Sequence, residues 1–193
     1  MCLRFCCSHD DSSATGWKVG WAVGPPCLVR LVAAVQQWVT FSVPTPNQDA
    51  IAACLAEAKE PYETFGSYYE YVASEYQRKR DLLAGALHTA GIVPIMPDGG
   101  FFIMGDTSGI QFPEQYMNEV TTAMPTSPMP RDWAMSRWMT QEVGVTAIPP
   151  SAFYGQDNLH LASNLLRFAY CKEDDTILEA QRRFKEYFKA DSN

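Results

Sequence analysis

A long amphipathic segment in the middle of the chain is the feature that most constrains its fold. Between Glu63 and Ala90, apolar residues fall largely on one side of a helix, at Tyr68, Val72, Tyr76, Leu83 and Leu87. Gly91 follows, and glycine often ends a helix because it adopts left-handed backbone easily. Such a helix is stable mainly when its apolar side packs against other elements. We therefore predict a helix over residues 63–90 that covers a sheet or other helices.

The residues after this helix predict the sheet. Short runs of β-branched and aromatic residues, bounded by proline or glycine, are typical of strands. They lie at residues 92–96, 101–106, 145–148 and 165–170. Asp132 is expected to cap a helix that ends near Val143, and Asp174 and Asp175 should begin a final helix, whose dipole favours acidic side chains there. The order of elements predicts an α+β layer, a sheet covered by helices.

The first part of the chain is organised differently. Residues 1–14 are polar and cysteine-rich without a clean period, and we expect a disordered start. Residues 17–24 combine β-forming residues with a Gly-Pro-Pro stop, which predicts a strand followed by a helix to about Trp38. Asn47 is the expected N-cap of a further helix.

Composition and charge exclude several classes of function. The chain has 193 residues, 47% of them apolar, and a net charge of −7, which indicates a globular protein and no nucleic-acid partner. No apolar stretch reaches the roughly 18 residues of a membrane helix, so we expect no membrane partner. The six cysteines and three histidines lack the close spacing of a zinc site, which predicts no metal. Free thiols favour an intracellular location, either cytoplasmic or mitochondrial.

Five short motifs, in order along the chain, carry a resemblance to a known family. The most specific is Thr-Gly-Trp-Lys-Val-Gly-Trp at residues 15–21. The others are Gln-Gln to Pro-Thr at 36–45, Pro-Asp-Gly-Gly-Phe-Phe at 97–102, Ala-Ile-Pro-Pro-Ser-Ala-Phe at 147–153 and Leu-Arg-Phe-Ala-Tyr at 166–170. Together they resemble the C-terminal portion of class I/II, fold type I aminotransferases that depend on pyridoxal phosphate (PLP), in particular the kynurenine aminotransferase and cysteine-S-conjugate β-lyase subfamily.

The resemblance implies an α/β fold, the C-terminal part of the fold type I PLP-transferase fold. Residues 15–58 would be a remnant of the large PLP-binding domain, and residues 59–193 the small α+β domain. It also implies a homodimer, and a transaminase that moves an amino group from kynurenine, glutamine-like or aromatic amino acids to a 2-oxo acid. For some such relatives, the resemblance also implies cleavage of cysteine S-conjugates by β-elimination.

The resemblance assigns roles to three residues. Lys18 matches the basic residue that contacts the PLP phosphate, and Arg167 matches the arginine that binds the substrate's α-carboxylate. Phe41 matches an aromatic residue that reaches into the neighbouring subunit's site. Without the resemblance, a solvated lysine, a structural salt bridge and core packing would be the ordinary interpretations of these three residues.

One position departs from the family. Counted back from Thr15, the lysine that forms the Schiff base falls at Asp10, and a carboxylate cannot form an imine. We therefore expect a truncated form of the enzyme that is inactive alone and has no catalytic residue of its own. The alternative is an inert chain that acts only as a dimerisation or interaction module.

Overall fold

The computed structural model of the chain describes residues 4–7, 15–122, 125 and 128–190. By its internal contacts the chain divides into two compact units, residues 1–74 and 75–193. Helix α4 (Tyr68–Thr89) begins in the first unit and continues into the second.

The first unit consists of a two-stranded sheet and two helices. Strand β1 (Arg4–Cys7) pairs antiparallel with β2 (Gly20–Val23), and a short 3₁₀ turn, η1 (Thr15–Trp17), precedes β2. The helices are α2 (Pro26–Val39) and α3 (Thr45–Glu57). Both carry proline in the first turn, where the missing N–H costs little. The strand expected at 17–24 is thus shorter, and β1 lies inside the segment 1–14, where the sequence predicted no regular element.

The start of α3 differs from the prediction. The helix begins at Thr45, so Asn47 lies inside the first turn and is not the N-cap. Its Nδ2 instead donates to the carbonyl oxygen of Trp17 at 2.9 Å. Asn47 therefore ties α3 to the residue that precedes Lys18.

Helix α4 begins later than predicted, at Tyr68 instead of residue 63. The Ser67 hydroxyl accepts a hydrogen bond from the Glu70 amide at 3.3 Å, and the Glu70 carboxylate accepts from the Gly66 amide at 3.0 Å. This pair of bonds resembles a capping box, which satisfies amide groups that a helix start leaves unpaired. The Ser-x-x-Glu spacing at 67–70 is therefore the signal that sets this boundary.

The second unit is built on an antiparallel sheet of three strands in the order β3 (Val93–Ile95), β4 (Phe102–Asp106) and β5 (Leu165–Ala169). Because strand side chains alternate, β4 and β5 each present a buried and a half-buried face. Ile103 pairs with Phe168 on the buried face, and Met104 pairs with Arg167 on the other. The predicted strand at 145–148 is reduced to a bridge between Ile148 and Arg167, since Pro149 and Pro150 follow.

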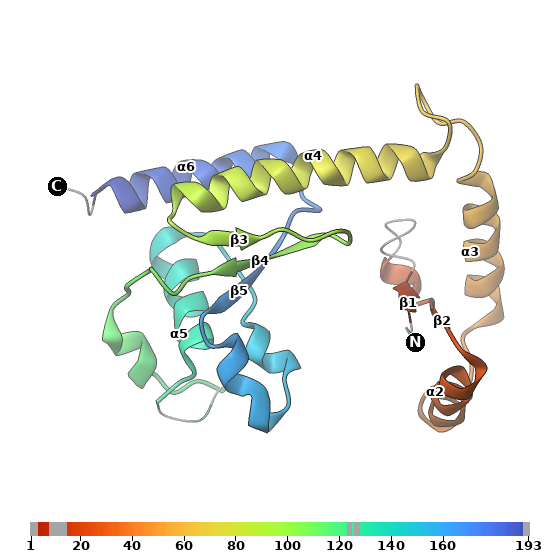
Figure 1. Cartoon of the computed structure of the whole chain (residues 1–193), viewed down its shortest axis with the longest axis horizontal. Helices are drawn as coiled ribbons and strands as arrows, with labels where there is room; N and C mark the ends of the chain where they lie inside the picture. The colour runs from red at the N-terminus through yellow and green to blue at the C-terminus, as the bar shows by residue number, and fades with distance from the viewer. Residues whose placement is uncertain (1–3, 8–14, 123–124, 126–127, 191–193) are drawn as a thin grey trace. The chain divides into compact units, whose positions relative to one another are not determined.

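Helices α4 and α6 (Asp174–Ala190) lie side by side along the sheet (Figure 1). Arg78 of α4 pairs with Asp174 of α6, with Nη1 to Oδ2 at 2.7 Å. The buried faces meet in one core, whose largest fully buried side chains include Leu87, Ile92, Ile103, Met135, Trp138, Met139, Leu166, Tyr170 and Phe184. Within the described residues, no helix combines the length and the apolar character needed to cross a membrane.

The helix predicted from Asp132 to Val143 is present but changes form. Helix α5 spans Arg131–Trp138 and continues as a π-helical turn, η3 (Met139–Val143), which ends at Gly144 with a left-handed φ of 76°. Asp132 is not the N-cap, which is Pro130; it lies in the first turn and is buried.

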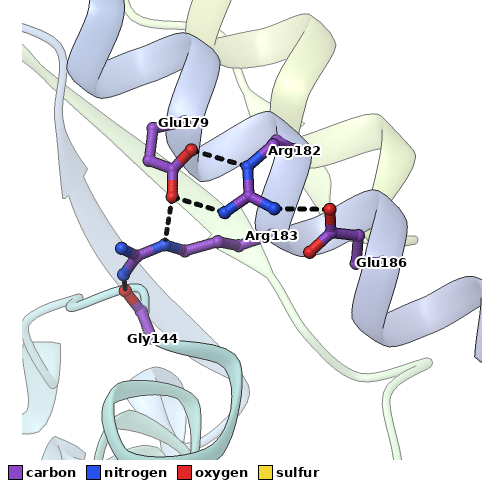
Figure 2. Close-up of polar contacts among 5 residues, drawn as sticks. All are labelled: Gly144, Glu179, Arg182, Arg183 and Glu186. Atoms are coloured by element: carbon purple, nitrogen blue, oxygen red, sulfur yellow. Dashed lines mark hydrogen bonds and ion pairs between the residues drawn. The ribbon is translucent and has the colours of Figure 1, made fainter.

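Helix α6 carries a network of charged side chains on its exposed side (Figure 2). Glu179 accepts from Arg182 Nε at 2.7 Å and from Arg183 Nε at 2.8 Å, and Arg182 also pairs with Glu186. Arg183 Nη1 donates to the carbonyl oxygen of Gly144 at 2.6 Å. The network therefore attaches α6 to the end of the η3 turn, although exposed ion pairs of this kind stabilise a fold only slightly.

Candidate active site

A hollow in the first unit brings together two of the three predicted site residues. It has a volume of about 690 Å³, and Lys18, Trp21, Gln36, Thr40 and Phe41 are among the residues that line it. Lys18 lies between η1 and β2, and Phe41 is the second residue after the end of α2. The hollow therefore lies where a strand and the end of a helix meet within one unit.

The backbone at both residues is unusual. The φ angle is 55° at Lys18 and 63° at Phe41, and among the described non-glycine residues only Glu63 also has a positive φ. A left-handed backbone costs a residue with a side chain on the order of 1–3 kcal/mol and persists only where its surroundings enforce it. Such strain is common at functional sites. It coincides here with the residues that the family resemblance selected.

Hydrogen bonds hold the backbone at or next to both residues. Asn47 holds the carbonyl of Trp17, next to Lys18. The amide of Phe41 donates to the carbonyl of Gln36 at 3.1 Å, and the amide of Ser42 donates to the carbonyl of Thr40 at 2.8 Å. The Phe41 ring itself is 87% exposed, so core packing does not account for it.

The charge of the hollow suits an anion. Of the described residues that line it, Lys18 is the only cation and none is acidic. A lysine ammonium is a compact point charge that binds phosphate without the planar geometry of an arginine. The residues present therefore fit the phosphate of a bound cofactor.

Arg167 lies in the second unit, on the half-buried face of β5. Its guanidinium carbon lies 4.1 Å from the ring centroid of Phe102 and 4.6 Å from that of Phe153. Phe102 shares this face because it precedes Met104, the partner of Arg167, by two residues on β4. Phe153 comes from a separate 3₁₀ turn, η4 (Pro150–Phe153), and is 64% exposed.

The guanidinium of Arg167 forms no ion pair with a carboxylate of the described residues. Its Nε is buried and has no hydrogen-bond partner, and among the described residues no carboxylate forms an ion pair with it. Leaving a buried donor unpaired is costly. A guanidinium that pairs with no described carboxylate is a candidate to bind an anion from outside the chain. A carboxylate is a good match because it accepts two parallel hydrogen bonds from one guanidinium. Within the described residues, Arg167 is therefore not part of a structural salt bridge.

One predicted position cannot be located in the structure, and two neighbours of Arg167 were not predicted. Asp10, the predicted position of the Schiff-base lysine, lies outside the described residues. Phe102 and Phe153 were not predicted as site residues, although alternation along β4 places Phe102 beside Arg167. Nothing in the sequence pattern indicates the contact with Phe153. No cluster of three potential metal-binding side chains occurs in the described ranges.

Comparisons with known proteins identify the class of this chain. Residues 11–184 match the class I and II aminotransferases, a family that depends on PLP, and the chain belongs to this family. It is 43% identical over 169 residues to the kynurenine–oxoglutarate transaminase of Dictyostelium discoideum, and 33% identical over 173 residues to kynurenine–oxoglutarate transaminase 3 of Rattus norvegicus. The matches cover 87% and 90% of this chain but 37% and 36% of those proteins.

The fold is confirmed in the same way. The solved structure of Bna3p from Saccharomyces cerevisiae matches with a TM-score of 0.76 and 30% identity, over 95% of this chain and 41% of Bna3p. The predicted α/β fold of the fold type I aminotransferases is therefore correct. The chain spans little more than a third of the length of the curated relatives it matches.

Proposed function

We propose that this chain supplies the substrate-carboxylate contact and the cofactor-phosphate contact of a PLP-dependent transaminase. The proposed reaction transfers the amino group of kynurenine, a glutamine-like or an aromatic amino acid to a 2-oxo acid. Cysteine-S-conjugate β-elimination is a related activity of the same site. The names of the relatives, kynurenine–oxoglutarate transaminases, support this substrate class. The observation that carries the proposal is the Arg167 guanidinium, which has two aromatic neighbours and no ion pair with any described carboxylate.

Arg167 binds and orients the substrate in this proposal. Its in-plane N–H groups donate to both oxygens of the α-carboxylate, which an amino acid and a 2-oxo acid share. The same contact therefore binds both the amino-acid donor and the 2-oxo-acid acceptor of the amino group. We call this contact between Arg167 and the α-carboxylate the carboxylate grip. Holding the carboxylate in a fixed plane also fixes the direction of the bonds at the α-carbon, where the reaction takes place.

Lys18 and Phe41 act on the cofactor side. Lys18 offers its ammonium to the PLP phosphate, in a hollow without acidic side chains among its described lining. Bound PLP supplies the electron sink for chemistry at the α-carbon of the substrate. The Phe41 side chain is 87% exposed and is therefore available to a neighbouring subunit's site.

The carboxylate grip is tested by calorimetric titration of the 193-residue chain with 2-oxoglutarate. We expect saturable binding that weakens at least about tenfold in Arg167→Lys, which keeps the charge but loses the bidentate geometry. Arg182→Lys is the matched control, because Arg182 pairs with carboxylates on the exposed side of α6. Equal affinity in the wild-type chain and Arg167→Lys would contradict the assignment.

The 193-residue chain by itself is proposed to show no turnover. Asp10 occupies the position expected for the imine-forming lysine, and a carboxylate is not an amine. The noncovalent contacts at Arg167 and Lys18 are independent of that group. Binding without turnover is therefore the expected behaviour of the isolated chain.

A second candidate is a dimerisation or interaction module, and the surface of α2 favours it. None of the described residues of this helix is buried, and Leu31, Val35 and Trp38 recur along one side with exposures of 65%, 61% and 85%. A large exposed apolar side is typical of an interaction surface. Members of the family are typically dimeric, which makes a second subunit the proposed partner.

This candidate is tested by sedimentation velocity. We expect self-association of the wild-type chain that Trp38→Glu reduces. Leu178→Glu is the control, because Leu178 is an exposed apolar residue, 46% accessible, on α6 of the other unit. A monomer at all concentrations, or equal effects of the two variants, would argue against an interface on α2.

We also propose an intracellular location, in the cytoplasm or the mitochondrion. Cys27 and Cys54 are exposed free thiols, and Cys171 is a half-buried one. Exposed unpaired thiols persist in reducing compartments, where disulfides are rare. Fractionation of cells that express the tagged chain would test this.

A further inference from the structure

Helix α5 holds the chain segment that precedes Phe153 by three side-chain hydrogen bonds. The Ser151 amide donates to Asp132 Oδ2 at 2.9 Å, and Trp133 Nε1 donates to Ser151 Oγ at 3.1 Å. Ser136 Oγ donates to the carbonyl oxygen of Ala147 at 2.6 Å. One helix therefore fixes this segment at both of its ends, Ala147 and Ser151.

The same segment is fixed to Arg167 between these two points. The Ile148 amide donates to the Arg167 carbonyl, and the Arg167 amide donates to the Ile148 carbonyl, each at 3.0 Å. The chain then turns through η4, where the Tyr154 amide donates to the Ser151 carbonyl at 3.1 Å. Phe153 lies two residues after Ser151, so the position of its ring depends on where Ser151 is held.

Asp132 is the buried carboxyl group in this arrangement, with 1% of its surface exposed. Its Oδ2 accepts from the Ser151 amide, while Oδ1 has no hydrogen-bond partner among the described residues. A buried carboxylate is costly and requires compensation. The compensation comes from the charge-assisted bond to Ser151 and from the positive end of the α5 dipole, since Asp132 lies in the first helical turn.

We propose that Asp132, acting through Ser151, positions Phe153 against the guanidinium of Arg167, and that Asp132 and Phe153 are positioning residues for the carboxylate grip. The role of the grip rests on the proposed function, whereas the coupling between Asp132 and the Arg167 environment does not. Phe153 is 64% exposed, so its ring contributes little to the core, and its described contact is with Arg167.

The contact with Phe153 restrains Arg167 without occupying its donors. A cation over an aromatic face is attracted by the ring, and this contact uses none of the guanidinium N–H groups, which lie in their own plane. Phe102 supplies one such contact from β4, and Phe153 supplies the other from η4. Losing the second contact frees the long arginine side chain to adopt other rotamers, which weakens carboxylate binding without removing the charge.

The coupling is tested by nuclear magnetic resonance on the full 193-residue chain. Ring currents from Phe102 and Phe153 shift the Arg167 Nε–H and Cδ–H₂ resonances, which report ring position directly. We expect the part of this shift that is due to Phe153 to disappear in Phe153→Leu. It should shrink in Asp132→Ala and remain largely in Asp132→Asn, because the asparagine carbonyl still accepts from the Ser151 amide. Asp175→Asn, on α6 away from this segment, is the matched control.

Titration of the same variants with 2-oxoglutarate adds the functional arm. Phe153→Leu and Asp132→Ala should weaken binding by about three- to tenfold, the size expected for one cation–π contact. If Asp132→Ala does not fold, the affinity of Phe153→Leu for 2-oxoglutarate decides the binding test, since an exposed ring is not needed for folding. Its loss of the ring-current shift together with weaker binding supports the proposal.

The two proposals fail in different ways. If Asp132→Ala leaves the Arg167 resonances unchanged, or if Phe153→Leu leaves both the resonances and the affinity unchanged, positioning through this segment is wrong, even if 2-oxoglutarate binds. Suppose instead that the Arg167 resonances change in Asp132→Ala and Phe153→Leu, but the wild-type chain does not bind 2-oxoglutarate. The coupling is then correct, and the proposed carboxylate contact at Arg167 is wrong.

Discussion

Replacing Gly105 with alanine tests the packing of the sheet that carries Arg167. Gly105 lies on the buried face of β4, opposite Leu166. An added Cβ would lie 2.5 Å from Ile92 Cγ2 and 3.1 Å from Phe168 Cε2. Carbon atoms pack at about 3.5–4.0 Å, so Ile92 must move by roughly 1 Å within a fully buried site.

Overpacking of this kind typically costs about 1–3 kcal/mol of unfolding free energy. For a unit somewhat larger than 100 residues, each kcal/mol lowers the melting temperature by roughly 3–6 °C. We therefore expect Gly105→Ala to melt roughly 3–18 °C below the wild-type chain when followed by circular dichroism, and a urea titration should show the matching loss of unfolding free energy.

Gly85→Ala is the control with the opposite expected sign. Gly85 is exposed on α4, and a Cβ there meets no atom within 4 Å. Removing glycine from a helix interior stabilises it by roughly 0.5–1 kcal/mol. If Gly105→Ala were as stable as the wild-type chain, or if both substitutions stabilised it, the close approach of Ile92 and Phe168 to β4 would be wrong.

Three further predictions concern charge and chemistry. The hydrogen bonds from Arg182 and then Arg183 lower the pKa of Glu179 to about 2, so carbon-detected titration should show this carboxyl ionised down to about pH 2. The stabilisation it provides is present above the ordinary carboxyl pKa and is lost as the pH falls towards 2, and Arg182→Gln should move the pKa upwards. The hydrogen bond to Glu142 raises the pKa of Tyr116 to about 12, so ultraviolet titration should show this phenol ionising near pH 12. Its contribution is present below the ordinary phenol pKa and is lost as the pH rises through 12; Glu142→Gln should lower the pKa. With added PLP, kynurenine and 2-oxoglutarate, the isolated chain should give no turnover, and turnover that survives Lys18→Met would refute the assigned roles.

The strands and the final helix were predictable because their patterns are local. Alternation along β4 and β5 depends only on neighbouring residues, and the acidic start of α6 marks its own boundary. The start of α4 was predicted at residue 63, although the periodic apolar residues begin only at Tyr68, where the helix starts. The Ser67 and Glu70 hydrogen bonds decide the boundary, and they are visible in the sequence as a capping pattern.

Features that depend on distant residues were not predictable. Asn47 has the composition of an N-cap, yet its amide finds the carbonyl of Trp17, thirty positions away. Asp132 likewise suited a cap but binds the Ser151 amide. Lys18, Phe41 and Arg167 were selected by resemblance alone. The strained backbone at the first two and the unpartnered Nε of the third are properties of the folded chain, and they support those selections independently.

The most direct test of the carboxylate grip is a crystal structure of the chain grown with 2-oxoglutarate. We predict a carboxylate in the plane of the Arg167 guanidinium, with its oxygens about 2.7–2.9 Å from two N–H donors. Phe102 and Phe153 should keep their contacts with the guanidinium. A structure in which Arg167 pairs with a carboxylate of the protein, and 2-oxoglutarate is bound elsewhere or not at all, would contradict the account.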